Sequence, residues 1–187
     1  MDREANLVFV TSNMNKLREA RKLLGMQIKN ANLELREVQS LSVKEVAGIK
    51  AREAYRILKK PVMVEDTGLY IRGFGGFPGA LVKWTTNGVG YEGVCRLVDS
   101  CRSRDAYAET CVALCDGKSV KRFVGRIEGS IAMEPKGSRN FGWDYIFIPK
   151  GSAKTFAEMS VSEKNKVSMR RVAFSKLLHF LSEKSRI

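Results

Sequence analysis

A run of short polar side chains ends in a lysine close to the start of the chain. It follows an apolar segment at residues 7–10 and precedes a helical pattern. Backbone amides at a helix N-terminus, small polar side chains and a lysine one turn later are what a phosphate group needs. Ser, Thr and Asn are also the usual capping residues, so an ordinary N-cap turn stays open as an alternative. The glycines and the Lys-Ser/Thr pair of a Walker motif are absent. The run consists of Thr11, Ser12, Asn13, Met14, Asn15 and Lys16.

Two adjacent acids, Glu65 and Asp66, come directly after the apolar residues 62–64 and before Thr67. Ionised carboxylates beside an apolar strand need compensation. A divalent cation would supply it, because Mg²⁺ is commonly held by one or two carboxylates together with substrate phosphate oxygens. Glu37, near the end of an earlier strand-like segment, is a further candidate ligand. The alternatives are a turn in which Asp66 caps the next element and a solvated acid at position 37.

An aromatic turn precedes a short strand-like segment in the second half of the chain. Phe141, Gly142, Trp143 and Asp144 combine flat rings, a flexible residue and a hydrogen-bonding acid. Ring stacking plus contacts to the base edge is how proteins generally hold a purine outside a duplex. Both rings would serve equally well as core aromatics.

The hydrophobic periodicity predicts alternating strands and helices in the first half of the chain. Residues 7–10 form an apolar strand and residues 16–24 a helix. Residues 33–38 alternate as a half-buried strand, and residues 43–58 form an amphipathic helix. Residues 62–64 then read as a buried strand that leads into the acidic turn.

The second half predicts a glycine-rich loop, a β-hairpin and a final helix. The loop covers residues 73–79, and helical turns follow at residues 94–101. Asp116-Gly117 is a hairpin signal between two strand-like runs. Ser160 and Glu163 have the spacing of a capping box in front of a long amphipathic helix. That helix carries Lys164, Met169 and Arg170, and a charged helix face explains most of its sequence. The strand-like segments are 106–114, 120–127 and 145–148.

Length and composition favour one mixed α/β domain over residues 1–187, with 44% hydrophobic residues available for a core. No run is long and apolar enough for a membrane helix, and the start lacks the pattern of a signal peptide, so we expect a cytoplasmic protein. The spacing of the four cysteines does not favour disulfides or a zinc site. A net charge of +13 predicts an anionic partner, with a merely solvated basic surface as the alternative.

Taken in order, these motifs resemble those of the inosine triphosphate pyrophosphatase family over nearly the whole chain. Each motif alone has little specificity, whereas several in register are specific. The matching segments are Thr11 to Lys16, Glu65 to Gly68, Gly75 to Gly79, Lys83-Trp84, Phe141 to Asp144, Phe156 to Met159 and Glu163 to Asn165.

The resemblance implies an enzyme that hydrolyses ITP, dITP and XTP to the monophosphate and pyrophosphate. It implies an elongated α/β fold with two lobes around a cleft, a homodimer, and a requirement for Mg²⁺ with Mn²⁺ as a substitute. Glu37 and Asp66 would bind the metal, and Asp66 would also orient or deprotonate the attacking water. The triphosphate would contact Thr11, Ser12, Asn13, Met14, Asn15, Lys16, Lys50, Thr67 and Lys83. The base would lie among Phe141, Gly142, Trp143, Asp144, Lys164, Met169 and Arg170.

Two residues depart from the family pattern. Ser12 replaces a glycine in the phosphate turn, and Met169 replaces a histidine beside Arg170. The base-edge contact of that histidine would therefore be missing, and we expect weaker discrimination between inosine and adenosine triphosphates.

Three other functions would each account for part of the sequence. A nucleic-acid-binding module would use the positive charge, but no recognisable motif is present and the paired acids would repel phosphate. A related pyrophosphatase of the Maf-like family, acting on modified pyrimidines, is disfavoured by the aromatic turn at Phe141 to Asp144. A folded, non-catalytic nucleotide sensor remains open. The expected partners are the nucleotide and a second subunit. We do not expect binding to nucleic acid or to a membrane.

Overall fold

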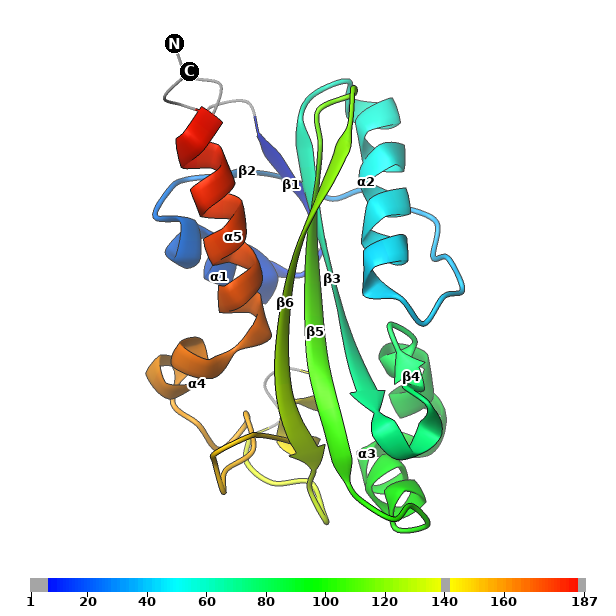
Figure 1. The fold of residues 1–187 in the computed structure, drawn as a ribbon. Helices are drawn as coiled ribbons and strands as arrows, with labels where there is room; N and C mark the ends of the chain where they lie inside the picture. Colours follow the sequence, from blue (N-terminus) through cyan, green and yellow to red (C-terminus); the bar gives the residue numbers. More distant parts are fainter. Residues whose placement is uncertain (1–6, 139–141, 185–187) are drawn as a thin grey trace.

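The computed structural model describes residues 7–138 and 142–184. Figure 1 shows long, twisted strands running through the middle of an elongated molecule, with α2 (Val43–Leu58) on one side and α1 (Met14–Leu24) and α5 (Met169–Lys184) on the other. Among the described residues the sheet has seven strands in the order β2-β1-β3-β5-β6-β7, with β4 paired to β3. The strands are β1 (Val8–Val10), β2 (Lys29–Ala31), β3 (Val62–Ile71), β4 (Pro78–Gly79), β5 (Asp105–Cys115), β6 (Val120–Ile131) and β7 (Phe147–Pro149).

The sheet is mixed, as the sequence predicts. Strand β1 pairs in parallel with β2 and β3, and the remaining neighbours are antiparallel. The helices are α1 (Met14–Leu24), α2 (Val43–Leu58), α3 (Val82–Val98), α4 (Val161–Val167) and α5 (Met169–Lys184). Two 3₁₀ turns, η2 (Arg72–Phe74) and η3 (Gly142–Ile146), complete the elements.

Helix α2 has the bounds that its pattern predicts. The Ser42 side chain accepts a hydrogen bond from the Glu45 amide and so caps the first turn. Small buried side chains, among them Ala47, Ala51 and Ala54, allow the helix to lie close against β3 and β5. The helix therefore packs tightly against one face of the sheet.

Side chains of β3 alternate between the two faces of the sheet, as strand geometry requires. Val62, Val64 and Tyr70 belong to the apolar cluster around α2. Met63 belongs to the cluster formed with α1 and α5. Glu65 and Asp66 consequently point to opposite faces, although they are adjacent in the sequence.

The acidic turn predicted after residue 64 is wrong, because Glu65 and Asp66 lie inside the ten-residue strand β3. A glycine in β3 allows a second strand to pair with it. A Cβ atom added to Gly68 would lie 2.8 Å from the carbonyl carbon of Gly79, so strand β4 can pair with β3 only where no side chain intervenes.

The strand predicted at residues 33–38 is also wrong. These residues form neither a helix nor a strand, and the sheet edge is occupied by β2 instead. Their alternation has a different cause, because Leu33 and Leu35 pack against the apolar cluster around α2 while the backbone lacks a strand neighbour.

The predicted final helix is two helices, separated at Ser168. This residue is extended at φ −84° and ψ 143°, and its hydroxyl accepts a hydrogen bond from the Arg171 amide. Ser168 thus ends α4 and caps α5. The capping box of Ser160 and Glu163 is confirmed at the start of α4. The amphipathic pattern of the predicted helix would place Val167 on or near its apolar face, but Val167 is 38% exposed.

Two further boundaries differ from the prediction. Helix α3 begins at Val82 rather than near residue 94, and Gly90, at φ 73°, kinks it. The strand predicted at residues 145–148 is shifted, because η3 occupies the chain up to Ile146.

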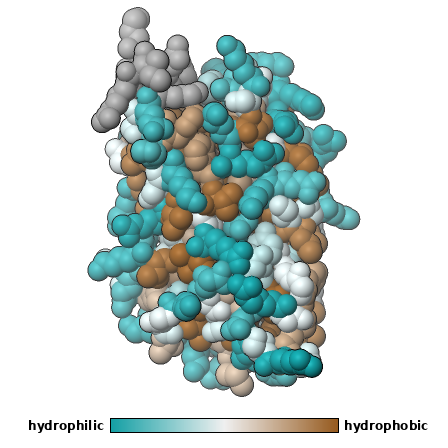
Figure 2. Space-filling model, viewed as in Figure 1, coloured by the Kyte–Doolittle hydropathy of each residue, from teal (hydrophilic) through white to brown (hydrophobic). Residues whose placement is uncertain are grey.

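The four cysteines are free thiols. Burial raises the pKa of Cys95 to about 11 and that of Cys111 to about 12. Within the described residues, no helix has the length and apolar character needed to cross a membrane. Figure 2 shows hydrophilic side chains spread broadly over one face of the molecule, with apolar side chains in smaller patches between them.

Candidate functional site

A cleft of about 970 Å³ opens where the phosphate run, the centre of β3 and the start of α3 meet. Its volume suits a nucleotide-sized ligand. Many of the residues predicted from the sequence line it. These are Thr11, Ser12, Asn13, Asn15, Lys16, Glu37, Lys50, Asp66, Thr67, Lys83, Gly142 and Trp143.

The run after β1 forms a rigid turn at the N-terminus of α1. The Asn13 side chain accepts hydrogen bonds from the amides of Asn15 and Lys16 at 3.0 and 3.2 Å. The Thr11 hydroxyl accepts from the Asn13 amide at 3.1 Å. Asn13 is therefore an N-cap, and the turn also presents the positive end of the helix to the cleft. Met14 is 57% exposed and does not line the cleft.

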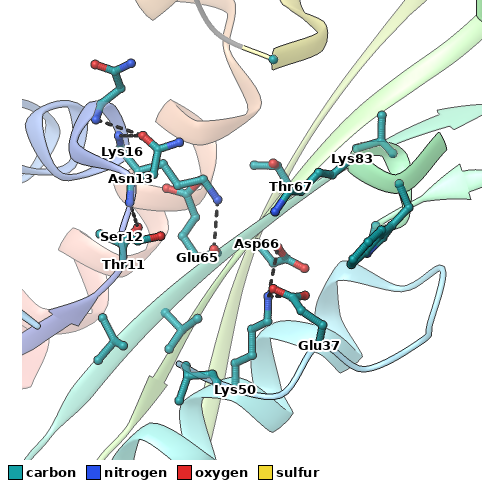
Figure 3. A pocket seen from close by; sticks show the side chains of 18 of the residues that line it. Thr11, Ser12, Asn13, Lys16, Glu37, Lys50, Glu65, Asp66, Thr67 and Lys83 are labelled. Atoms are coloured by element: carbon teal, nitrogen blue, oxygen red, sulfur yellow. Dashed lines mark hydrogen bonds and ion pairs between the residues drawn. The ribbon is translucent and has the colours of Figure 1, made fainter. Parts of the chain in front are cut away.

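Lys16 extends from α1 across to β3. Its ammonium group donates to the backbone oxygen of Glu65 at 3.1 Å and lies 3.5 Å from the Glu65 carboxylate. Figure 3 shows this side chain reaching over the strand toward the acids. A positive charge is thereby fixed at the wall of the cleft beside the phosphate turn.

Asp66 and Glu37 share one lysine on the opposite face of β3. Lys50, from α2, lies 2.9 Å from the Glu37 carboxylate and 3.9 Å from that of Asp66. The three side chains point toward one another in Figure 3. Burial raises the pKa of Asp66, and the charges of Lys16 and Lys50 oppose this effect.

The donor set fits a divalent cation that is shared with its substrate. In the part of the chain that the structure describes, no group of three or more His, Cys, Asp or Glu side chains could hold a metal ion by itself. Two carboxylates with open space beside them match the usual Mg²⁺ arrangement, in which substrate oxygens and waters complete the shell. Glu37 and Asp66, which both line the cleft, could supply these two carboxylates.

A buried ion-pair network behind the cleft was not predicted from the sequence. Arg170 of α5 donates to both carboxylate oxygens of Glu65 at 2.8 to 3.1 Å and also pairs with Glu19 of α1. Burial opposes ionisation of Glu65, but Arg170 and Lys16 outweigh it and keep its pKa below the usual value. Arg170 is 1% exposed and does not line the cleft.

The predicted base-binding residues are only partly brought together at the cleft. Gly142 and Trp143 line it, whereas Phe141 lies outside the described residues. Trp143 is largely buried and meets Phe147 edge-on at 5.9 Å. Asp144 is buried and ion-paired with Lys164; burial raises the Asp144 pKa while Lys164 opposes the rise.

Met169, the second departure from the family pattern, is 1% exposed and packs in an apolar cluster with Trp143. Its side chain does not line the cleft. A histidine at this position would replace an apolar contact of the core.

Several cleft residues were missed by the sequence reasoning. Trp84 is 59% exposed and lies next to Lys83, whose ammonium group is 5.9 Å from the indole ring. Tyr91 contacts Tyr145 with ring centres 4.2 Å apart. Trp84 belongs to the Lys83-Trp84 segment that matches the family pattern, and helical spacing from Lys83 is a local signal for the others. The missed residues on α3 are Val82, Trp84, Thr86, Asn87 and Tyr91.

Known proteins are similar to this chain over nearly its whole length. The Ham1 family profile matches residues 7–180. A dITP/XTP pyrophosphatase of Hyperthermus butylicus is 39% identical over 184 residues, covering 96% of this chain and 97% of the relative. An inosine triphosphate pyrophosphatase of Yarrowia lipolytica is 41% identical over 185 residues, covering 96% and 97%.

A solved structure agrees with these sequence matches. A HAM1 protein from Coxiella burnetii superposes with a TM-score of 0.84 at 28% identity, covering 95% of this chain and 98% of the other. Fold, sequence and profile therefore agree over nearly the full length, and the chain belongs to the Ham1 family.

Proposed function

We propose that this protein hydrolyses non-standard purine nucleoside triphosphates, such as ITP, dITP and XTP, to the monophosphate and pyrophosphate. The observation that carries the proposal is the opposition, across one cleft, of the capped N-terminus of α1 with Lys16 and the carboxylates of Asp66 and Glu37. The names of the relatives at 39% and 41% identity support the same substrate class.

The positive groups of the cleft bind and orient the triphosphate. The N-terminus of α1 after Asn13 and the side chains of Lys16, Lys50 and Lys83 line the space where the phosphates would lie. Placing these charges in a fixed geometry favours the transition state, because phosphoryl transfer depends mainly on positioning and on charge stabilisation.

A bound divalent cation, Mg²⁺ or Mn²⁺ in its place, would neutralise phosphate charge and polarise the phosphoryl group. Glu37 and Asp66 would hold it. Asp66 has the further role of aligning a water with the α-phosphorus and accepting its proton, since its carboxylate lies within the cleft. Pyrophosphate then leaves from the opposite side.

The base would lie toward Trp143 and Tyr91, where aromatic side chains line the cleft. We propose in addition that the protein is a homodimer. Its mass in solution, measured by light scattering, tests this: about twice the 21.0 kDa of one chain supports the dimer, and the mass of a single chain contradicts it.

Product analysis tests the proposed activity. With Mg²⁺ and ITP, the protein should release IMP and pyrophosphate. Asp66→Asn, which keeps nearly the same shape, should lower kcat by about a thousandfold or more while the fold is retained. Release of orthophosphate, or an unchanged rate in a folded Asp66→Asn variant, would contradict the proposal.

A further inference from the structure

Tyr70 connects the metal-binding face of β3 to the segment that carries Glu37. It lies four residues after Asp66 and on the same face of the strand. Its hydroxyl donates to the carbonyl oxygen of Leu41 at 2.8 Å and accepts from the Val43 amide at 3.1 Å. Burial raises the pKa of Tyr70 to about 12, so the hydroxyl keeps the proton that it donates.

The same carbonyl is held from a second side. The Ala80 amide donates to the Leu41 oxygen at 2.9 Å. A Cβ atom added to Gly79 would lie 2.4 Å from that oxygen, and Gly79 has a positive φ of 56°. The backbone at Leu41 therefore lies between Tyr70 and the turn at β4. It fits there because Gly79 has no side chain.

Glu37 lies between this attachment and an earlier one. On its N-terminal side, the Arg36 amide donates to the Glu53 carboxylate of α2 at 3.2 Å. The Glu37 side chain itself is 57% exposed and forms an ion pair with Lys50. An exposed carboxylate has little packing to fix it, so its position depends on how firmly the backbone on both sides is held.

The ring of Tyr70 is itself held in place, so its hydroxyl can hold the backbone near Glu37. It is 7% exposed and stacks on Tyr107 of β5, with centroids 4.6 Å apart and ring planes within 2° of parallel. The guanidinium carbon of Arg126, from β6, lies 3.5 Å from the centre of the Tyr107 ring. Contacts with three adjacent strands thus immobilise the Tyr70 side chain. Its hydroxyl therefore loses little conformational entropy when it binds the backbone of Leu41 and Val43.

We propose that Tyr70 is a positioning residue for the divalent cation: by fixing residues 39–43, it holds Glu37 where its carboxylate can bind the same cation as Asp66. This inference rests on the proposed function, in which these two carboxylates are the metal ligands. Without the hydroxyl, Asp66 keeps its position, but Glu37 has to be ordered each time the metal binds.

Tyr70→Phe tests the proposal, because it removes both hydrogen bonds and keeps the ring. Mn²⁺ binding is measured by electron paramagnetic resonance in the presence of α,β-imido-ITP, which resists hydrolysis. The variant should bind Mn²⁺ about tenfold more weakly, as expected from two lost hydrogen bonds. Exchange of amide hydrogens should become faster at residues 39–43, while kcat at saturating metal should stay within about twofold of the original value.

Tyr107→Phe is the matched control, since it also removes one phenolic hydroxyl from the ring stack but contacts neither Leu41 nor Val43. It should change neither Mn²⁺ binding nor amide exchange. Gly79→Ala is a second test that leaves Tyr70 untouched. Its added methyl group should displace Leu41 and weaken Mn²⁺ binding in the same direction.

Two outcomes would overturn the inference in distinguishable ways. If Tyr70→Phe accelerates exchange at residues 39–43 but binds Mn²⁺ as the original protein does, Tyr70 does not position the metal site. If Glu37→Gln leaves Mn²⁺ affinity unchanged, Glu37 is not a metal ligand, and the proposed metal site fails together with the inference. Weaker Mn²⁺ binding in Glu37→Gln and Tyr70→Phe, but not in Tyr107→Phe, supports both.

Discussion

Glu65 and Asp66 are adjacent acids with different surroundings. Glu65 is buried against Arg170 and Lys16, which keep its pKa low, whereas Asp66 lies in the cleft and burial raises its pKa. The pleat of β3 separates them, because it directs successive side chains to opposite faces of the sheet. The Glu65 carboxylate therefore links β3 to α1 and α5 through its ion pairs, and the Asp66 carboxylate is available to bind metal and water.

Arg170→Met should reveal the structural acid through its pH dependence. At pH 7 the substitution leaves Glu65 and Glu19 without their shared partner, and we expect a loss of about 3 to 5 kcal/mol in the free energy of unfolding. In the original protein the lowered Glu65 pKa contributes stability above its unfolded value, and this contribution is lost as the pH falls through the folded pKa.

Without Arg170, burial should raise the Glu65 pKa, so acidification should favour the folded variant. The difference in unfolding free energy between the two proteins should therefore shrink as the pH falls from 7 toward about 4.5. Urea titrations at several pH values measure it. If the difference in unfolding free energy between the two proteins is the same at every pH, Arg170 does not lower the pKa of Glu65.

At the scale of elements, α5 lies unusually close to β6. A Cβ atom added to Gly125 of β6 would lie 1.9 Å from the backbone oxygen of Met169, at the start of α5. The contact matters for the site because α5 carries Arg170, whose partner Glu65 lies next to Asp66.

Gly125→Ala should therefore destabilise the protein, by about 1 to 3 kcal/mol, because neither backbone segment can move without disturbing the core. Gly88→Ala provides the matched control: nothing lies within 4 Å of the added Cβ atom, and the position is in helix α3. There alanine should be neutral or slightly stabilising. Thermal unfolding of the two variants compares them directly. Equal melting temperatures would contradict the close approach of α5.

The elements were predictable to the extent that their signals are local. Helix α2 and the β5–β6 hairpin have clear periodicity and clear ends, and both were predicted closely. Strand β3 was predicted too short, because Glu65, Asp66 and Thr67 interrupt its apolar pattern, although its pairing with β5 continues through them.

The site was predictable as a set of residues but not as a set of contacts. The phosphate turn and the acids at the cleft carry recognisable residue types in sequence. The pairing of Glu65 with Arg170 joins residues 105 positions apart, and neither residue shows its partner locally. The position of Glu37 depends on hydrogen bonds to the backbone of Leu41, which residue types do not encode.

At the scale of the whole molecule, the net charge of +13 suits a highly anionic substrate. A surplus of positive charge attracts a nucleoside triphosphate from a distance, and salt screens that attraction. The value of kcat/KM for ITP should fall severalfold as ionic strength rises from about 0.02 to 0.2 M, whereas kcat should change little. Equal values of kcat/KM at both ionic strengths would show that the surface charge has another role.

In the proposed reaction, water attacks the α-phosphorus of a purine nucleoside triphosphate bound in this cleft. Hydrolysis of ITP in ¹⁸O-labelled water, followed by mass spectrometry of both products, tests the site of attack. Attack at the α-phosphorus breaks its bond to the bridging oxygen, so the label should appear in IMP and be absent from pyrophosphate. Label in the pyrophosphate would place the attack at the β-phosphorus and contradict the account.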